Sequence, residues 1–178
     1  MIMVLTNDDV KKDIVTITER LGDGGHTIAN PLTALKLSSI YTLPCTVLHA
    51  AITIFIYATI SNSSVVLWGF LIIASFSFVV TLTQYTNALM YLAIPESVRR
   101  ESIILSRIKK VYLRTVLMSI TANILTVLLF FFTREYLLAI PIVFIAGFLL
   151  NQVVLNTEIT RYGIGALLHK TATLIKRI

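Results

Sequence analysis

Charged residues are scarce in this sequence and are confined to a few segments. Lys, Arg, Asp and Glu make up 13% of the 178 residues, whereas they make up about 25% of a typical soluble domain. No charged side chain occurs in residues 37–95, and residues 115–155 contain only Arg134 and Glu135. These runs exclude a water-soluble fold and predict segments that cross a membrane.

Cysteine is also scarce, and the motifs of common enzyme classes are missing. The single cysteine, Cys45, excludes an intrachain disulfide, and neither His26 nor His169 has a partner at metal-ligand spacing. The sequence has no phosphate-binding loop, no nucleophile elbow and no pair of carboxylates inside an apolar run. We therefore expect a protein that is not an enzyme and that binds no cofactor or metal.

Four apolar stretches have the length of membrane-spanning helices: residues 41–60, 65–84, 115–132 and 136–155. A helix of 20 residues is about 30 Å long, which matches the hydrocarbon thickness. The predicted fold is an all-α integral membrane protein with two helical hairpins, each closed by a short polar turn. Its parts are an N-terminal segment (1–40), a transmembrane domain (41–155) with a loop at 85–114, and a tail (156–178). Residues 85–94 are expected to continue the second helix.

The loop between the predicted hairpins is strongly basic. Basic loops beside apolar spans stay on the cytoplasmic side. With both termini inside as well, only Arg134 of the 15 basic residues lies outside. The sequence thus predicts a multi-pass protein of the cytoplasmic membrane, and the very short outer turns suit a bacterium. The net charge of +6 is explained by this placement, so no nucleic-acid partner is expected. The loop cations, our candidate interaction residues, are Arg99, Arg100, Arg107, Lys109, Lys110 and Arg114.

Three segments outside the spans have amphipathic helical patterns. In the first, apolar residues recur at spacings of four, three and four, and its acidic residues favour a protein partner over anionic lipid. In the loop, apolar residues lie opposite the cations, which predicts a helix on the inner leaflet or on a partner. The tail has a similar pattern. The apolar positions are Val10, Ile14, Ile17 and Leu21; Val98, Ile104 or Leu105, Ile108, Val111 and Tyr112; and Ile164, Leu167, Leu168, Leu174, Ile175 and Ile178.

Few polar residues lie inside the spans. His49 and Asn123 each lie eight residues into a span that begins at the inner face, so we expect their side chains to meet directly or through one water. Asn151 and Gln152 lie one turn from the inner end of the fourth span, where they line a cavity or reach toward the interface. Such groups usually form interhelical hydrogen bonds of ~0.6 kcal/mol. The functional alternative is a proton relay or a ligand contact.

Two functions are compatible with this pattern. The first is a small interaction or assembly protein that contacts another membrane protein laterally or self-associates. Exclusion, immunity, secretion and conjugation-apparatus components are proteins of this kind. The alternative is a small oligomeric transporter or channel with a polar path through His49, Asn123 and Asn151. Ion-coupled transport usually requires a carboxylate or a cation inside the spans, and none is present, so the first function is preferred.

Overall fold

The computed structural model describes residues 6–22, 30–59, 64–133 and 139–163. All regular structure in these residues is helical. Four helices are long and apolar enough to cross a membrane: α3 (Thr42–Thr59), α4 (Ser64–Ala93), α6 (Ile103–Thr133) and α7 (Ala139–Arg161). The predicted fold class is confirmed at this level. Three shorter helices, α1 (Asn7–Gly22), α2 (Pro31–Ser38) and α5 (Glu96–Glu101), complete the described chain.

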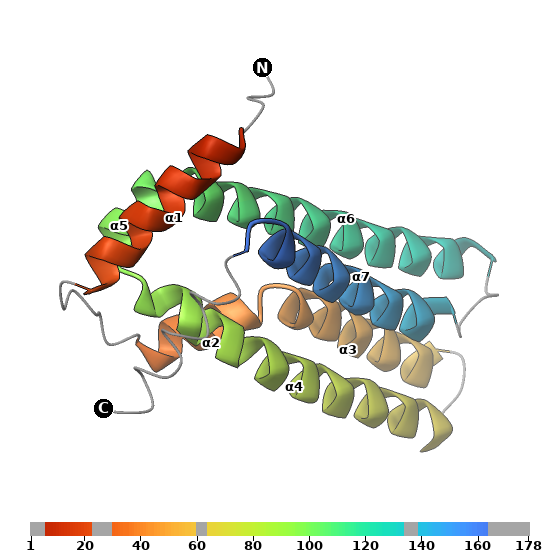
Figure 1. Ribbon diagram of the computed structural model, residues 1–178. Coiled ribbons are helices and arrows are strands. Elements are labelled where there is room, and N and C mark those ends of the chain that lie inside the picture. Colours follow the sequence, from red (N-terminus) through yellow and green to blue (C-terminus); the bar gives the residue numbers. More distant parts are fainter. Residues whose placement is uncertain (1–5, 23–29, 60–63, 134–138, 164–178) are drawn as a thin grey trace.

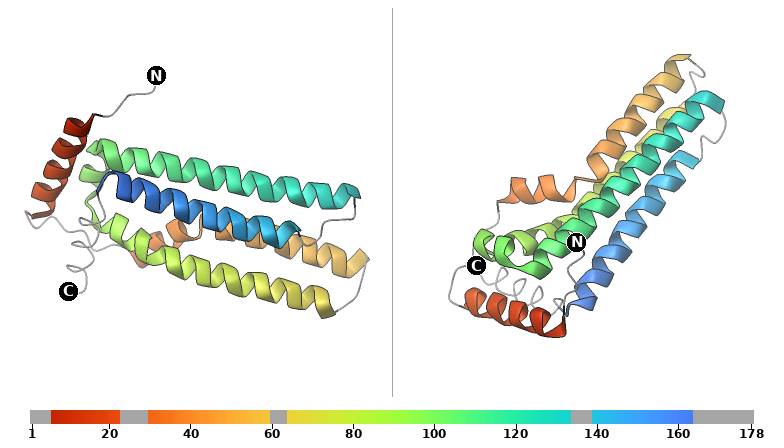
Figure 2. Two further views of the ribbon diagram at one scale, coloured as in Figure 1. Left: turned by 45° about the vertical axis from the view of Figure 1, so that its right-hand side comes forward. Right: turned by 90° about the horizontal axis from the view of Figure 1, so that it is seen from above.

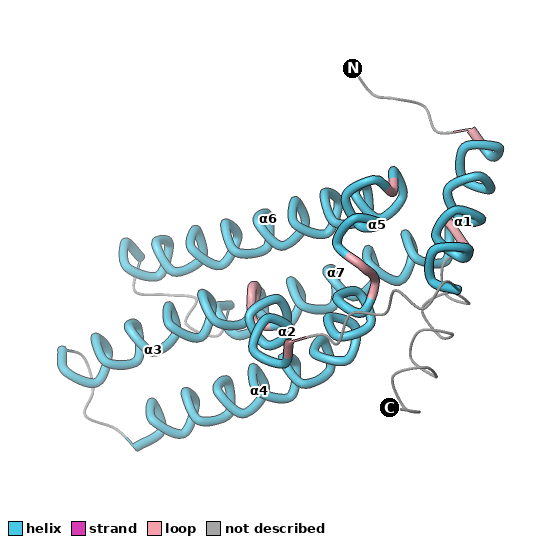
Figure 3. Tube along the Cα trace, turned by 90° about the vertical axis from the view of Figure 1, so that its left-hand side faces the viewer, coloured by secondary structure: helices cyan, strands magenta, loops and turns pink. Residues whose placement is uncertain are grey.

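The four long helices run side by side as a bundle, and the short helices gather at one end of it (Figure 1). Two further views show α1 lying across that end, beside the start of α6, while α2 lies alongside α4 (Figure 2). In the tube view the same end faces the viewer, with α5 between α1 and α6 (Figure 3). The short helices therefore form a separate layer at one end of the bundle.

Two of the spanning helices are longer than the predicted spans. α4 continues through residues 85–93 as expected and stops before Pro95, whose ring disfavours a helical residue before it. α6 begins at Ile103, so the second half of the basic loop is continuous with the third span. The single loop helix predicted over residues 96–114 is thus divided in two. The division lies at Ser102, whose extended backbone (φ −66°, ψ 119°) ends α5.

Buried stripes on α3, α6 and α7 form the core of the bundle together with Ser77, Val80, Gln84 and Ala88 of α4. Each stripe advances by three or four residues, which is the spacing of one helical face. α4 packs against α3 through hydroxyl pairs, Thr42 with Thr81 at 2.7 Å and Thr46 with Ser77 at 2.8 Å. The stripes are Cys45, His49, Ile52 and Ile56 on α3; Val116, Ser119, Asn123, Val127 and Phe130 on α6; and Ile140, Phe144, Gly147 and Asn151 on α7.

Some predicted segments lie outside the described residues. These are most of the two turns expected at 61–64 and 133–135, the first residues of the fourth predicted span, and most of the amphipathic tail at 164–178. The described part of α7 continues to Arg161, beyond the predicted end of the span at 155.

Candidate functional site

The polar groups of the three core stripes form a row inside the apolar bundle. At one level, the Tyr41 hydroxyl donates a hydrogen bond to the carbonyl of Phe144 at 2.6 Å, and the two rings stack with centroids 5.6 Å apart. A Cβ placed on Gly147 would lie 2.5 Å from the Tyr41 hydroxyl oxygen and 3.1 Å from the Cβ of Ser119. The absence of a side chain at Gly147 is therefore what allows α3, α6 and α7 to meet here.

His49 and Asn123 are both buried in this row, but they do not hydrogen-bond to each other. His49 Nδ1 lies 2.6 Å from the Cys45 carbonyl oxygen, and Asn123 Nδ2 lies 2.9 Å from that of Ser119. A carbonyl only accepts, so His49 Nδ1 carries a proton. Neither His49 Nε2 nor Asn123 Oδ1 has a hydrogen-bond partner among the described residues. No hydrogen bond joins the two side chains, so the direct form of the predicted contact is not observed. Contact through a water molecule remains a prediction.

Several polar atoms of the row have no hydrogen-bond partner among the described residues. They are His49 Nε2, Asn123 Oδ1, Ser119 Oγ and both amide atoms of Asn151. Asn151 is fully buried at the end of the row nearer the short helices, so it does not reach toward the interface. Gln152 is half-buried, and its amide nitrogen is also without a partner. Buried unpaired groups of this kind are usually satisfied by internal water.

An apolar cluster closes the row at its other end. Its members lie beyond His49 on α3, beyond Asn123 on α6, and before Phe144 on α7, which runs in the opposite direction. Among the described residues, no buried polar side chain lies beyond His49 on α3, beyond Asn123 on α6 or before Gly147 on α7, so the polar row stops part of the way through the bundle. The cluster consists of Ile52, Ile56, Val127, Phe130 and Ile140.

The apolar stripe of α1 packs against the junction of α5 and α6. Ile17 is buried with Val98 and Leu105, while Val10 and Ile14 pack against Ile104. This contact was not predicted, because a stripe in the sequence does not identify the surface that covers it. The covering surface is the chain's own basic loop.

Polar contacts hold α1 in this position. Oδ2 of Asp13 accepts hydrogen bonds from Ser102 Oγ at 2.8 Å and from the Ile104 N–H at 3.0 Å. Ser102 Oγ in turn accepts the Leu105 N–H at 3.0 Å. The free N–H groups at the start of α6 are thus satisfied partly by a carboxylate from another helix, the charge that a helix N-terminus favours. Arg20 and Glu101 add an exposed ion pair.

The loop cations fall into groups with different surroundings. The Arg99 guanidinium lies 5.1 Å from the Tyr91 ring centre, and Arg100 pairs with Glu96 within α5. Arg107, Lys110 and Arg114 lie on one face of α6 at spacings of three and four, and Lys110 and Arg114 are exposed. Lys109 is exposed on a different side of the same helix. Among the described residues, no carboxylate forms an ion pair with these four α6 cations.

The described residues contain no group of three or more His, Cys, Asp and Glu side chains that could hold a metal ion. Comparison with protein-family models, curated proteins and solved structures gave no match. The function must therefore be inferred from the geometry of this chain.

Proposed function

We propose that this chain is a multi-pass protein of a bacterial cytoplasmic membrane that acts by lateral contact with another membrane protein. Exclusion, immunity and secretion or conjugation-apparatus components are of this class. In this proposal the four spans form two hairpins, and both termini and residues 85–114 lie in the cytoplasm. The concentration of 14 of the 15 basic residues on one side supports this orientation.

One face of α6, exposed from Lys110 to Met118, supports the proposal most strongly. Its first part carries Arg107, Lys110 and Arg114 without ion-pair partners among the described residues. Its second part is apolar, and Leu117 and Met118 are 65% and 63% exposed. A transmembrane helix whose cytoplasmic end is acidic would match this face in both parts. Charge complementarity would then select the partner, and apolar packing would hold it in the bilayer.

The docking of α1 also favours a fixed binding surface. Asp13 and Glu101 lie beside the start of α6, and both are already bonded, to Ser102 and Arg20 respectively. They are therefore not available to neutralise the three cations. An acidic segment from outside the chain would provide that neutralisation.

Photo-crosslinking in cells tests this surface. A photoreactive residue would replace Leu117 on the proposed face or, as a matched control, Ile72 on α4, which is 68% exposed. We expect a discrete protein adduct from position 117 and only lipid adducts from position 72. Replacing Arg107, Lys110 and Arg114 together with Gln should abolish the protein adduct. The remaining cations, Arg99, Arg100 and Lys109 among them, should preserve the orientation.

The same adduct from both positions, or an adduct unaffected by the triple replacement, would contradict lateral recognition by this face. If the triple variant fails to insert, the three single Gln variants provide the comparison. Each should reduce the adduct while leaving insertion intact.

The unpaired polar row supports the alternative, an oligomeric transporter or channel with a path through His49, Asn123 and Asn151. The apolar cluster around Val127 and Phe130 argues against such a path through one chain, because it ends the row inside the bundle. Transport would require that this cluster open. A flux assay in vesicles containing the purified chain tests this: flux that His49→Leu abolishes would favour the alternative.

A further inference from the structure

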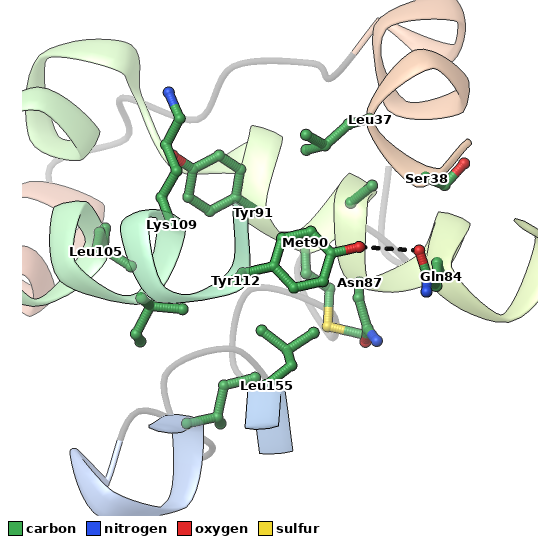
Figure 4. A pocket seen from close by; sticks show the side chains of 13 residues that line it. Leu37, Ser38, Gln84, Asn87, Met90, Tyr91, Leu105, Lys109, Tyr112 and Leu155 are labelled. Atoms are coloured by element: carbon green, nitrogen blue, oxygen red, sulfur yellow. Dashed lines mark hydrogen bonds between the residues drawn. The ribbon is translucent and has the colours of Figure 1, made fainter. Parts of the chain in front are cut away.

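A pocket lies between the ends of four helices beside the short-helix layer (Figure 4). Its volume is about 120 Å³, close to the ~150 Å³ of an apolar cavity that can hold benzene. Most of its wall is apolar, with side chains from α2, α4, α6 and α7. These include Leu37, Ala88, Met90, Ile108 and Leu155.

Two polar groups in the wall of the pocket, from Gln84 and Lys109, indicate a ligand that has both polar and apolar parts. Gln84 is 4% exposed, and its Oε1 accepts a hydrogen bond from the Tyr112 hydroxyl at 3.0 Å. Its Nε2 is buried with no partner among the described residues, which leaves a donor in the wall of the pocket. The Lys109 side chain extends from α6 at the edge of the pocket (Figure 4). Its ammonium has no ion-pair partner in the described chain.

The position of the pocket along α4 shows which layer of the bilayer surrounds it. Gln84 lies about 20 residues from the start of α4, a distance of ~30 Å that equals the hydrocarbon thickness. The pocket is therefore at the level where acyl chains meet the phosphate groups of a leaflet. Basic pockets between transmembrane helices at this level bind anionic lipid headgroups.

We propose that this pocket binds an anionic phospholipid. The phosphate lies at Lys109, and the glycerol backbone with the start of one acyl chain fills the space near Ala88. An ester carbonyl accepts the free Gln84 N–H, and the rest of the chain continues past Leu155 into the hydrocarbon. The occupied site holds α2 and α4 against α6 and α7. Only the identity of the leaflet, the inner one, depends on the orientation proposed above. The cations of the proposed partner face are on another side of α6, so the two surfaces can be tested separately.

Photolabelling of the full chain in lipid nanodiscs tests the site. Phosphatidylglycerol or phosphatidylcholine with a diazirine close to the ester end of one acyl chain would be added, and the labelled peptides mapped by mass spectrometry. We expect phosphatidylglycerol to label peptides containing Met90 and Leu155 more than phosphatidylcholine does. Ala88→Phe should fill the pocket and reduce this labelling to the level seen at the lipid-exposed Ile72.

Lys109 and Lys110 supply a matched pair, since both are exposed lysines of α6 and only Lys109 lines the pocket. Lys109→Gln should reduce the preference for phosphatidylglycerol about five-fold, which corresponds to ~1 kcal/mol for one cation. Lys110→Gln should leave it unchanged. Both variants change only an exposed side chain, so the comparison remains decisive if Ala88→Phe does not fold.

Equal effects of the two lysine replacements would overturn the proposal, because the attraction would then be a general property of the basic surface. Unchanged labelling in a folded Ala88→Phe variant would also overturn it. If labelling appears only after a copurifying protein has been removed, a side chain of that protein, and not a lipid, normally occupies the pocket.

Discussion

The Asp13 carboxylate and the Ser102 hydroxyl, 89 residues apart in sequence, are joined by a 2.8 Å hydrogen bond at the start of α6. This bond connects the first helix to the helix that carries the unpaired cations. Because the same carboxylate oxygen accepts the Ile104 N–H at 3.0 Å, docking of α1 and capping of α6 depend on one side chain.

Asp13→Ala should therefore loosen both helices. Loss of an N-cap acceptor usually costs ~1 kcal/mol, and Ile17 would lose its fixed position against Val98. We expect faster hydrogen–deuterium exchange in α1 and in the first turn of α6. Glu19→Ala removes an exposed acid of the same helix and should change neither. Equal exchange in the two variants would show that Asp13 does not hold the helices together.

The start of α1 should depend on pH through Asp9. The Thr6 hydroxyl donates to Asp9 Oδ2 at 2.6 Å and the Thr6 N–H at 3.1 Å, an arrangement that resembles a capping box. The Thr6 hydroxyl is the largest cause that lowers the pKa of Asp9 below its ordinary value of 3.8, followed by the Thr6 N–H. The stabilisation is thus present above this value and is lost as the pH falls through the lowered pKa.

NMR titration of the Asp9 carboxyl carbon measures this effect. Thr6→Ala should raise the midpoint toward 3.8, whereas Thr6→Ser keeps the hydroxyl and should preserve the lower midpoint. If the midpoint is the same in all three proteins, the Thr6 hydroxyl is not what lowers the pKa of Asp9.

Gly147→Ala should disturb the bundle at the point where its helices are closest. The added Cβ would collide with the Tyr41 hydroxyl oxygen at 2.5 Å and crowd Ser119. Overpacking of this kind costs roughly 1–3 kcal/mol. Gly69→Ala is the matched control, because a Cβ there meets nothing within 4 Å. Gly69→Ala should be neutral or slightly stabilising.

The collision can be tested further with Tyr41→Phe. This change removes the obstructing oxygen and its hydrogen bond to the Phe144 carbonyl. The double variant should be less destabilised than the sum of the two single variants, as measured by unfolding in detergent micelles. Additive effects would indicate that Ser119, and not Tyr41, limits the space.

The four spans could be predicted from the sequence because a bilayer requires about 20 consecutive apolar residues in each helix. The ends were less predictable, since backbone hydrogen bonding continues past the hydrocarbon. α6 therefore begins at Ile103 inside the basic loop. Ser102 divides that loop because Asp13 and its own hydroxyl satisfy the first N–H groups of α6. This contact joins distant segments and has no local signature.

The sequence also identified three of the buried polar side chains, His49, Asn123 and Asn151, but could not give their partners. Equal depth predicted that His49 and Asn123 would meet directly or through one water, whereas each forms a hydrogen bond to a carbonyl four residues earlier on its own helix. Residues that bond locally in this way leave no trace in apolar periodicity. The pocket beside Gln84 was not predicted either, because four helices contribute to its wall.

His49→Leu and Asn123→Leu should change stability only modestly if these residues are structural. Each loses a bond to its own helix, and such polar contacts in membranes average ~0.6 kcal/mol. Replacing either residue with an apolar side chain also removes a buried polar atom that has no hydrogen-bond partner among the described residues. Unfolding in micelles and a functional assay should be compared for each variant. Complete loss of activity in a folded, inserted variant would favour the transport alternative.

The final prediction is the orientation, on which the acidic end of the proposed partner depends. Cys45 is 1% exposed, so it should react little with maleimides, and Cys45→Ala provides a cysteine-free background. Single cysteines at Asn62 and Arg134 should react with a membrane-impermeant maleimide in intact cells. A cysteine at Lys110 should react only after permeabilisation, because the basic face of α6 would be cytoplasmic. If a cysteine at position 110 reacts in intact cells, the bundle has the opposite orientation in the membrane. The three α6 cations would then face the outer side, and a partner with an acidic cytoplasmic end could not reach them.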